Sequence, residues 1–84
     1  MTVKWEYYKD DYDLECCTGV VDGYSIDIFP FDDRFHFDVW NSGTLVLRSC
    51  DIQGRGARGC TSMDGAKSTA RFHIGKLKEG VVNE

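Results

Sequence analysis

The sequence predicts an α+β fold: an antiparallel β-meander of four to five strands with one C-terminal α-helix packed on one face. Through residues 3–50, apolar residues alternate with polar ones, which is the period of half-buried strands. Short segments rich in Asp, Asn and Gly interrupt this alternation at hairpin spacing. From residue 62 onward, apolar residues recur every three or four positions, which is typical of an amphipathic helix.

Length and composition favour a single domain over residues 1–84. A chain of 84 residues with 42% apolar content can build one core between two packed layers. No run of about 18 apolar residues is present, so no membrane span is expected. The N-terminal residues lack the apolar core of a secretion signal, and a cytoplasmic protein is therefore the expectation.

The first two strands are expected at about residues 3–9 and 12–20, and the turn after them allows two registers. A two-residue turn at Asp22-Gly23 would bury Glu15. A three-residue loop that includes Val21 would instead place Cys16 opposite Ile28. A slip of one residue turns every side chain to the other face, so burial favours the three-residue loop.

Strands three to five are expected at about residues 24–31, 34–40 and 44–50. The turn at Asp32-Asp33 pairs Ile28 with Phe37. A three-residue loop, Asn41-Ser42-Gly43, then places Phe37 opposite Leu47, with Gly43 in a left-handed conformation. All these registers place the large apolar side chains on one side of the sheet.

A loop over residues 51–61 leads into a helix expected at about residues 62–79. Ser62 is the predicted N-cap, and Gly80 is the predicted C-terminal stop. The apolar positions of this helix fall within about 80° of one another at 100° per residue. They are Met63, Ala66, Ala70, Ile74 and Leu77.

Catalytic and metal chemistry have no support in the residue pattern, so the expectation is no enzyme, no cofactor and no metal. The four cysteines lack the paired Cys-x₂₋₄-Cys spacing of zinc sites, and we expect them to be reduced. Neither His36 nor His73 can be linked by spacing to a nucleophile and an orienting group. Both histidines are interpreted as surface or boundary residues.

The sheet face away from the helix suggests an interaction surface. One helix leaves that face uncovered, and the predicted registers give it acids interleaved with aromatic side chains. Its expected members are Glu6, Tyr8, Glu15, Cys17, Asp27, Phe29, His36, Asp38, Trp40, Val46 and Arg48. The residues predicted to bind a partner are Asp27, Phe29, Asp38, Trp40, His36, Glu15 and, on the exposed side of the helix, Phe72.

Charge is distributed unevenly along the chain, with a total of -4. Residues 1–40 carry ten acids against three bases, whereas residues 41–84 carry seven bases against four acids. An acidic first half disfavours direct nucleic-acid binding. The nucleic-acid alternative would use Arg48, Arg55 and Arg58 with the basic helix. A second alternative is a structural homodimer subunit.

Two stretches resemble small phage and prophage accessory proteins. They are Gly23-Tyr-Ser-Ile-Asp-Ile-Phe with Phe35-His-Phe-Asp-Val-Trp-Asn-Ser-Gly43, and Ser62-Met-Asp-Gly-Ala-Lys-Ser-Thr-Ala70. The shared motifs are structural, and no catalytic or ligand residue follows from them. The resemblance implies an inhibitor of host defence in a bacterial cytoplasm, such as an anti-CRISPR protein. Its expected partner is a host protein or protein–nucleic-acid complex.

Overall fold

The computed structural model describes residues 3–52, 54 and 57–79, and it confirms the predicted α+β fold. Five antiparallel strands form one sheet in the order β1-β2-β3-β4-β5. The strands are β1 (Glu6–Lys9), β2 (Glu15–Val21), β3 (Tyr24–Phe31), β4 (Arg34–Asn41) and β5 (Thr44–Arg48), followed by the short 3₁₀-helix η1 (Ser49–Asp51) and by α1 (Met63–Lys78). Within the described ranges, no helix is long and apolar enough to cross a membrane.

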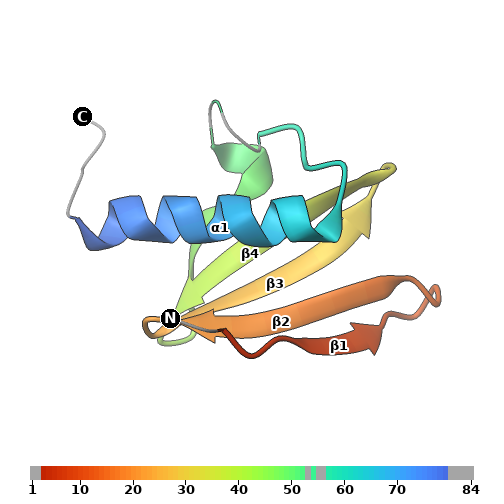
Figure 1. Ribbon diagram of the computed structural model, residues 1–84, viewed down its shortest axis with the longest axis horizontal. Helices are drawn as coiled ribbons and strands as arrows, with labels where there is room; N and C mark the ends of the chain where they lie inside the picture. The colour runs from red at the N-terminus through yellow and green to blue at the C-terminus, as the bar shows by residue number, and fades with distance from the viewer. Residues whose placement is uncertain (1–2, 53, 55–56, 80–84) are drawn as a thin grey trace.

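The core lies between α1 and the sheet, with the helix contacting mainly β3 and β4 (Figure 1). Ile26, Ile28, Phe37 and Val39 project toward the helix and are fully buried. The β3–β4 register pairs Ile28 with Phe37 and Ile26 with Val39, as predicted. This central hairpin therefore supplies the largest part of the apolar surface that the helix covers.

The helix begins where the sequence predicted. Ser62 is its N-cap, and the Ser62 hydroxyl accepts a hydrogen bond of 3.0 Å from the Gly65 amide. Ala66, Ala70 and Ile74 are buried against the sheet, and the two small alanines let the helix approach the strands closely. The predicted stop at Gly80 lies outside the described residues.

The predicted register of β2 is wrong by one residue. A two-residue turn at Asp22-Gly23, with φ of 52° and 86°, joins β2 to β3 and places Cys17, not Cys16, opposite Ile28. From the sequence, burial of Glu15 disfavours this turn. In the structure Glu15 stands at the end of the strand, beyond the cover of the helix, and it remains exposed.

Trp5 explains why β2 presents this face to the interior. Gly19, opposite Ile26, lies directly beneath the indole of Trp5, and a Cβ added at Gly19 would stand 2.7 Å from the Trp5 ring. The indole covers the part of β2 that α1 does not reach, together with Val21 and Cys17 of the core. A glycine at this position is therefore required by close packing.

The predicted β4–β5 register is also wrong. A two-residue turn, Ser42-Gly43, pairs Asn41 with Thr44, and a β-bulge between Val39 and Trp40 then shifts the ladder. As a result Val39 pairs with Leu47 rather than with Leu45, while Trp40 pairs with Leu45. The bulge returns Leu47 to the core side, where it packs against the buried cluster.

After η1 the chain returns to β4 along its open side. Phe35 and Cys60 form an isolated antiparallel bridge, with 2.8 Å hydrogen bonds from each amide to the other's carbonyl. This bridge extends the sheet beside the first half of β4, where β5 no longer reaches. It also positions Ser62, two residues later, to begin the helix on the core side.

Candidate protein-binding face

The side of the sheet that points away from α1 is called the outer face. Its centre is formed by Asp27 and Phe29 of β3 and by His36, Asp38 and Trp40 of β4. Because side chains alternate along a strand, these five lie on the other side of the sheet from the buried Ile26, Ile28, Phe37 and Val39, as the sequence predicted. All five are half-buried. The sequence therefore identified the middle of this face correctly.

The edges of the outer face differ from the prediction, because β2 is shifted. Cys17 is fully buried in the core, and Glu15 shares the helix side of the sheet with it. Cys16 and Thr18 take the outer positions on β2 instead, beside Tyr8 and Asp27 respectively. If each turn is taken to have two residues, the register of β2, and with it the outer positions of Cys16 and Thr18, is predicted correctly.

Phe72 lies on α1 and is 40% exposed, as the helical wheel predicted. Its ring makes an edge-on contact with His73 at 5.1 Å, and the Lys76 ammonium stands 5.1 Å from its centre. Since α1 covers the other side of the sheet, Phe72 is separate from the outer face.

Aromatic rings form a continuous row on the outer face. Phe29 and His36 are stacked, with centroids 6.2 Å apart and planes at 24°. Phe31 makes a T-shaped contact with the same His36 ring, with centroids 5.9 Å apart and planes at 75°. Contacts between π-systems in these geometries hold the rings in place and leave part of each ring surface available to a partner.

Two carboxylates stand next to this row. Asp27 and Asp38 are directly opposite each other on β3 and β4. Burial raises the pKa of the Asp38 carboxyl; Arg48 opposes the shift, and Asp27 and Asp51 add to it. Arg48 faces Asp38 on β5, but its Nε donates a 2.9 Å hydrogen bond to Asp51. The outer face thus contains a partly desolvated acidic pair whose nearest base is already paired.

Trp40 adds an unpaired donor to the same face. Its indole Nε1–H is buried and finds no acceptor among the residues that the structure describes. An unsatisfied buried donor costs about 1–3 kcal/mol.

Ser49 is a neighbour of His36 that the sequence did not reveal. His36 Nδ1 and Ser49 Oγ are 2.9 Å apart, and the hydroxyl also accepts a 3.2 Å hydrogen bond from the Phe37 amide. Ser49 is 1% exposed, so a substrate has no access to its oxygen. The pair holds η1 against β4, and a ladder continued without a bulge from the Asn41–Thr44 pair would have placed Ser49 opposite His36.

Thiol chemistry is disfavoured on both sides of β2. Burial raises the pKa of Cys16, with a further contribution from Asp10, and burial also raises the pKa of Cys17. Thiols with raised pKa values are protonated near neutral pH and are poor nucleophiles and ligands. Within residues 3–52, 54 and 57–79, no group of three His, Cys, Asp or Glu side chains could hold a metal ion.

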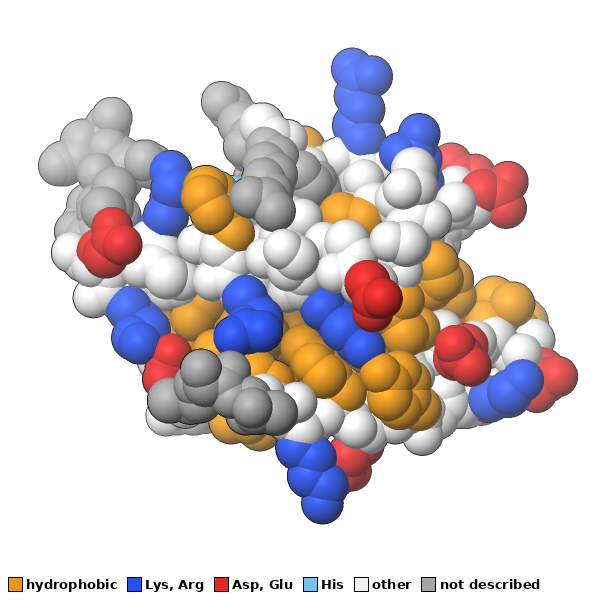
Figure 2. Space-filling model, in the orientation of Figure 1, with side chains coloured by type: hydrophobic (Ala, Val, Ile, Leu, Met, Phe, Trp, Pro, Cys, Tyr) orange, Lys and Arg blue, Asp and Glu red, His pale blue; other side chains and the backbone are white. Residues whose placement is uncertain are grey.

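The basic residues of the second half are mostly on α1, and several are bound within the protein. A shallow groove between α1 and β2 shows apolar side chains overhung by lysine and arginine (Figure 2). In this groove Lys78 forms a 2.8 Å ion pair with Asp22, and Lys67 donates to the Tyr7 hydroxyl. Lys67 also lies over the Trp5 ring.

The residues of the nucleic-acid alternative are dispersed. Arg48 is on β5 and is paired with Asp51 of η1, and Arg58 is exposed in the loop before Cys60. Arg55 lies outside the described residues. The nucleic-acid alternative therefore gains no specific observation from the structure.

Comparison of the chain with family models, with curated proteins and with solved structures found no match. The outer face is therefore the feature of this molecule that bears most directly on function.

Proposed function

We propose that this protein is a non-enzymatic inhibitor or adaptor of the phage type, which binds a host protein through its outer face. The partner surface would be basic, of the kind that a nucleic-acid-handling complex uses to hold phosphates. The observation that supports this best is the opposed pair Asp27 and Asp38 beside the aromatic row.

The acidic pair indicates that the partner surface is positively charged. Like charges opposed across two strands weaken a sheet, so the pair is a cost to the folded protein alone. A lysine or arginine inserted between Asp27 and Asp38 would remove the repulsion and form charge-assisted hydrogen bonds. Carboxylates would thereby occupy positions that phosphate groups take in the partner's normal ligand.

The aromatic side chains would supply affinity. Phe29 and Trp40 are half-buried, and burying the rest of their apolar surface in a complex is favourable by about 25 cal/mol per Å². Aromatic residues surrounded by charged residues are enriched at the centres of protein interfaces. Charge complementarity would orient the encounter and raise its rate.

A CRISPR effector complex is the partner class to test first, because the accessory-protein resemblance implies it. The experiment measures plating of a targeted phage on bacterial strains that each carry one defined CRISPR system. Strains express the wild-type protein, the outer-face variant Asp27→Asn/Asp38→Asn, or the control Asp64→Asn/Glu79→Gln. The control also removes two carboxylates, but from α1 and its C-cap.

We expect wild-type protein and control to raise plating in at least one strain, and the outer-face variant to lose most of that effect. Equal protection by the outer-face variant would refute the docking surface. No effect of the wild-type protein across strains that represent every CRISPR type would refute the proposed partner class. Circular dichroism of each variant confirms that it is folded.

A further inference from the structure

A second exposed apolar surface lies at one end of the sheet. The β1–β2 turn and the β3–β4 turn are both at this end, on the right in Figure 1. Tyr12 is 83% exposed, Phe31 67% and Leu14 46%. These three side chains are called the tip patch. Single exposed apolar side chains are ordinary, whereas three large ones at one end suggest an interaction surface.

Phe31 joins this patch to the outer face. The β2–β3 ladder ends at the pair Cys17–Ile28, and Leu14 and Phe31 follow beyond it toward the same end of the sheet. Phe31 projects on the outer face, because it follows Phe29 by two residues on the same strand. Phe31 also contacts His36, which stacks on Phe29. The tip patch is thus continuous with the outer face.

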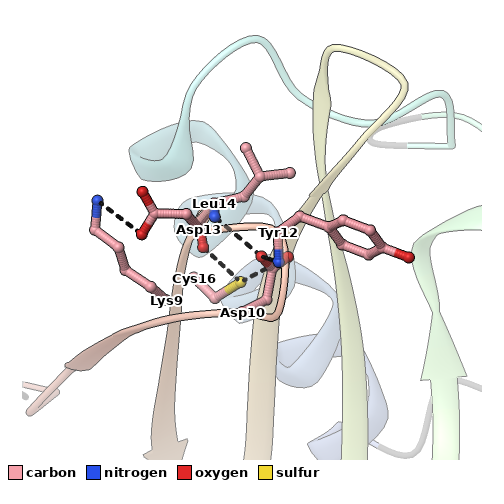
Figure 3. Close-up of polar contacts among 6 residues, drawn as sticks. All are labelled: Lys9, Asp10, Tyr12, Asp13, Leu14 and Cys16. Carbon is pink, nitrogen blue, oxygen red and sulfur yellow. Dashed lines mark hydrogen bonds and ion pairs between the residues drawn. The ribbon is translucent and has the colours of Figure 1, made fainter.

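A hydrogen-bonded turn presents Tyr12 and Leu14 (Figure 3). One carboxylate oxygen of Asp10 accepts hydrogen bonds of 2.9 Å from both the Tyr12 and the Leu14 amides. The Asp10 amide donates to the Leu14 carbonyl, and the Asp13 amide donates to the Asp10 carbonyl, each at 3.0 Å. Because the backbone of this turn is already ordered, the turn would lose little conformational entropy when its side chains bind a partner.

Acidic residues surround the tip patch. Residues 9–15 and 31–34 contain six acids, Asp10, Asp11, Asp13, Glu15, Asp32 and Asp33, against the two bases Lys9 and Arg34. Lys9 is paired with Asp13 at 3.8 Å. Red carboxylates accordingly gather at the right-hand end of Figure 2. Exposed aromatic rings among carboxylates match one side chain best: a guanidinium stacks on a ring face and pairs with a carboxylate at its edge.

We infer that the tip patch is the part of the docking surface that selects arginine, so that the partner contributes an arginine-bearing basic surface there. This inference rests on the proposed function and specifies its chemistry. Lysine would gain the charge attraction but less of the stacking, since its ammonium is compact and strongly hydrated. The tip patch would therefore discriminate between two basic surfaces of equal charge.

The test titrates ¹⁵N-labelled protein with octa-arginine and with octa-lysine peptides at low salt, followed by amide chemical shifts. We expect the arginine peptide to bind about ten-fold more tightly and to shift the amides of residues 10–15 and 29–36 most. Tyr12→Ala/Phe31→Ala should remove that preference without changing any charge. Phe72→Ala, which truncates an exposed ring on α1, should leave it intact.

Four other results separate this inference from the proposed function. Equal affinity for the two peptides, or a preference that survives Tyr12→Ala/Phe31→Ala, would overturn arginine selection at the tip patch and leave the outer face untouched. Amide chemical-shift changes confined to Asp27 and Asp38 would also overturn arginine selection at the tip patch. Shifts at the tip patch with phage plating unaffected by Asp27→Asn/Asp38→Asn would overturn the proposed docking surface and retain the arginine preference.

Discussion

Asp38 shows how a single residue can lower the stability of the folded protein. It faces Asp27 across β3 and β4, and burial raises the pKa of its carboxyl above the value of 3.8 in the unfolded chain. The folded protein therefore holds the Asp38 proton more tightly than the unfolded chain does. Above the raised pKa the charged carboxylate destabilises the fold, and this penalty disappears as the pH falls below it.

We expect Asp38→Asn to stabilise the protein by about 0.5 kcal/mol at pH 7, the scale of a like-charge pair across two strands. The advantage should shrink as the pH is lowered, because the raised pKa lets Asp38 take up its proton more readily in the folded state than in the unfolded chain. Urea unfolding of both proteins at pH 7, 5.5 and 4 measures the difference. An advantage that is constant with pH would mean that charge at Asp38 is not its cause; Asp64→Asn, at an exposed position on α1, serves as the control.

At the scale of the element, the hairpin turns determine how neighbouring strands of the sheet pair. Asp22-Gly23, Asp32-Asp33 and Ser42-Gly43 are all two-residue turns with positive φ at both positions. This geometry suits the right-handed twist of paired strands and favours Asn-Gly. Asp32-Asp33 is the exception, because its second position, with φ of 63°, is not glycine. A side chain in the left-handed region costs about 1 kcal/mol.

Replacing this turn by Asp32→Asn/Asp33→Gly should therefore raise the free energy of unfolding by roughly 1 kcal/mol. The control is Asp11→Gly, also an exposed turn aspartate, whose φ is not positive. Glycine there adds only freedom to the unfolded chain and should destabilise slightly. Thermal and urea unfolding of the three proteins would check this, and equal effects of the two substitutions would contradict the strain at Asp33.

The helix presents a second contrast within one element. Ile74 is 1% exposed over the sheet, whereas Leu77, also predicted to be in the buried stripe, is 38% exposed. We expect Ile74→Ala to cost about 2–4 kcal/mol, because it leaves a cavity in the core, and Leu77→Ala to cost less than about 1 kcal/mol. Urea unfolding measures both. Similar costs would show that the helix docks differently from the structure.

At the scale of the whole molecule, stability should be lowest at one edge of the sheet. All four residues of β1 are exposed, and β1 pairs only with β2. β3 and β4 are paired on both sides and contact α1. Local opening of β1 exposes little apolar surface, so its amides should open without global unfolding.

Native-state hydrogen exchange should therefore give the slowest rates in β3 and β4 and much faster rates in Glu6–Lys9. The amide of Gly19, whose strand is held by Trp5, should remain protected when β1 opens only locally. Equal protection of β1 and β3 would indicate instead that the sheet opens as one unit. The same experiment on Trp5→Ala tests how well Trp5 protects the part of β2 that α1 does not cover. We expect faster exchange in β2 of this variant.

Much of the fold follows from local pattern in the sequence. The alternation through residues 24–41 identifies β3 and β4 and their register, because Asp32-Asp33 leaves only one arrangement that buries Ile28 and Phe37 together. Ser62 and the apolar spacing after it similarly locate α1. These features depend on residues close together in the chain, where the periods of strand and helix alone decide burial.

Tertiary contacts decided the rest. Alternation in β2 is compatible with either face, and the choice follows from Trp5 packing on Gly19 and from the end of the helix cover at Glu15. The bulge at Val39 and Trp40 likewise returns Leu47 to the core. The tip patch exists because two turns, separated by about twenty residues in sequence, lie at the same end of the sheet. A period of two cannot choose between two faces, and that choice is made by side chains distant in sequence that must share one interior.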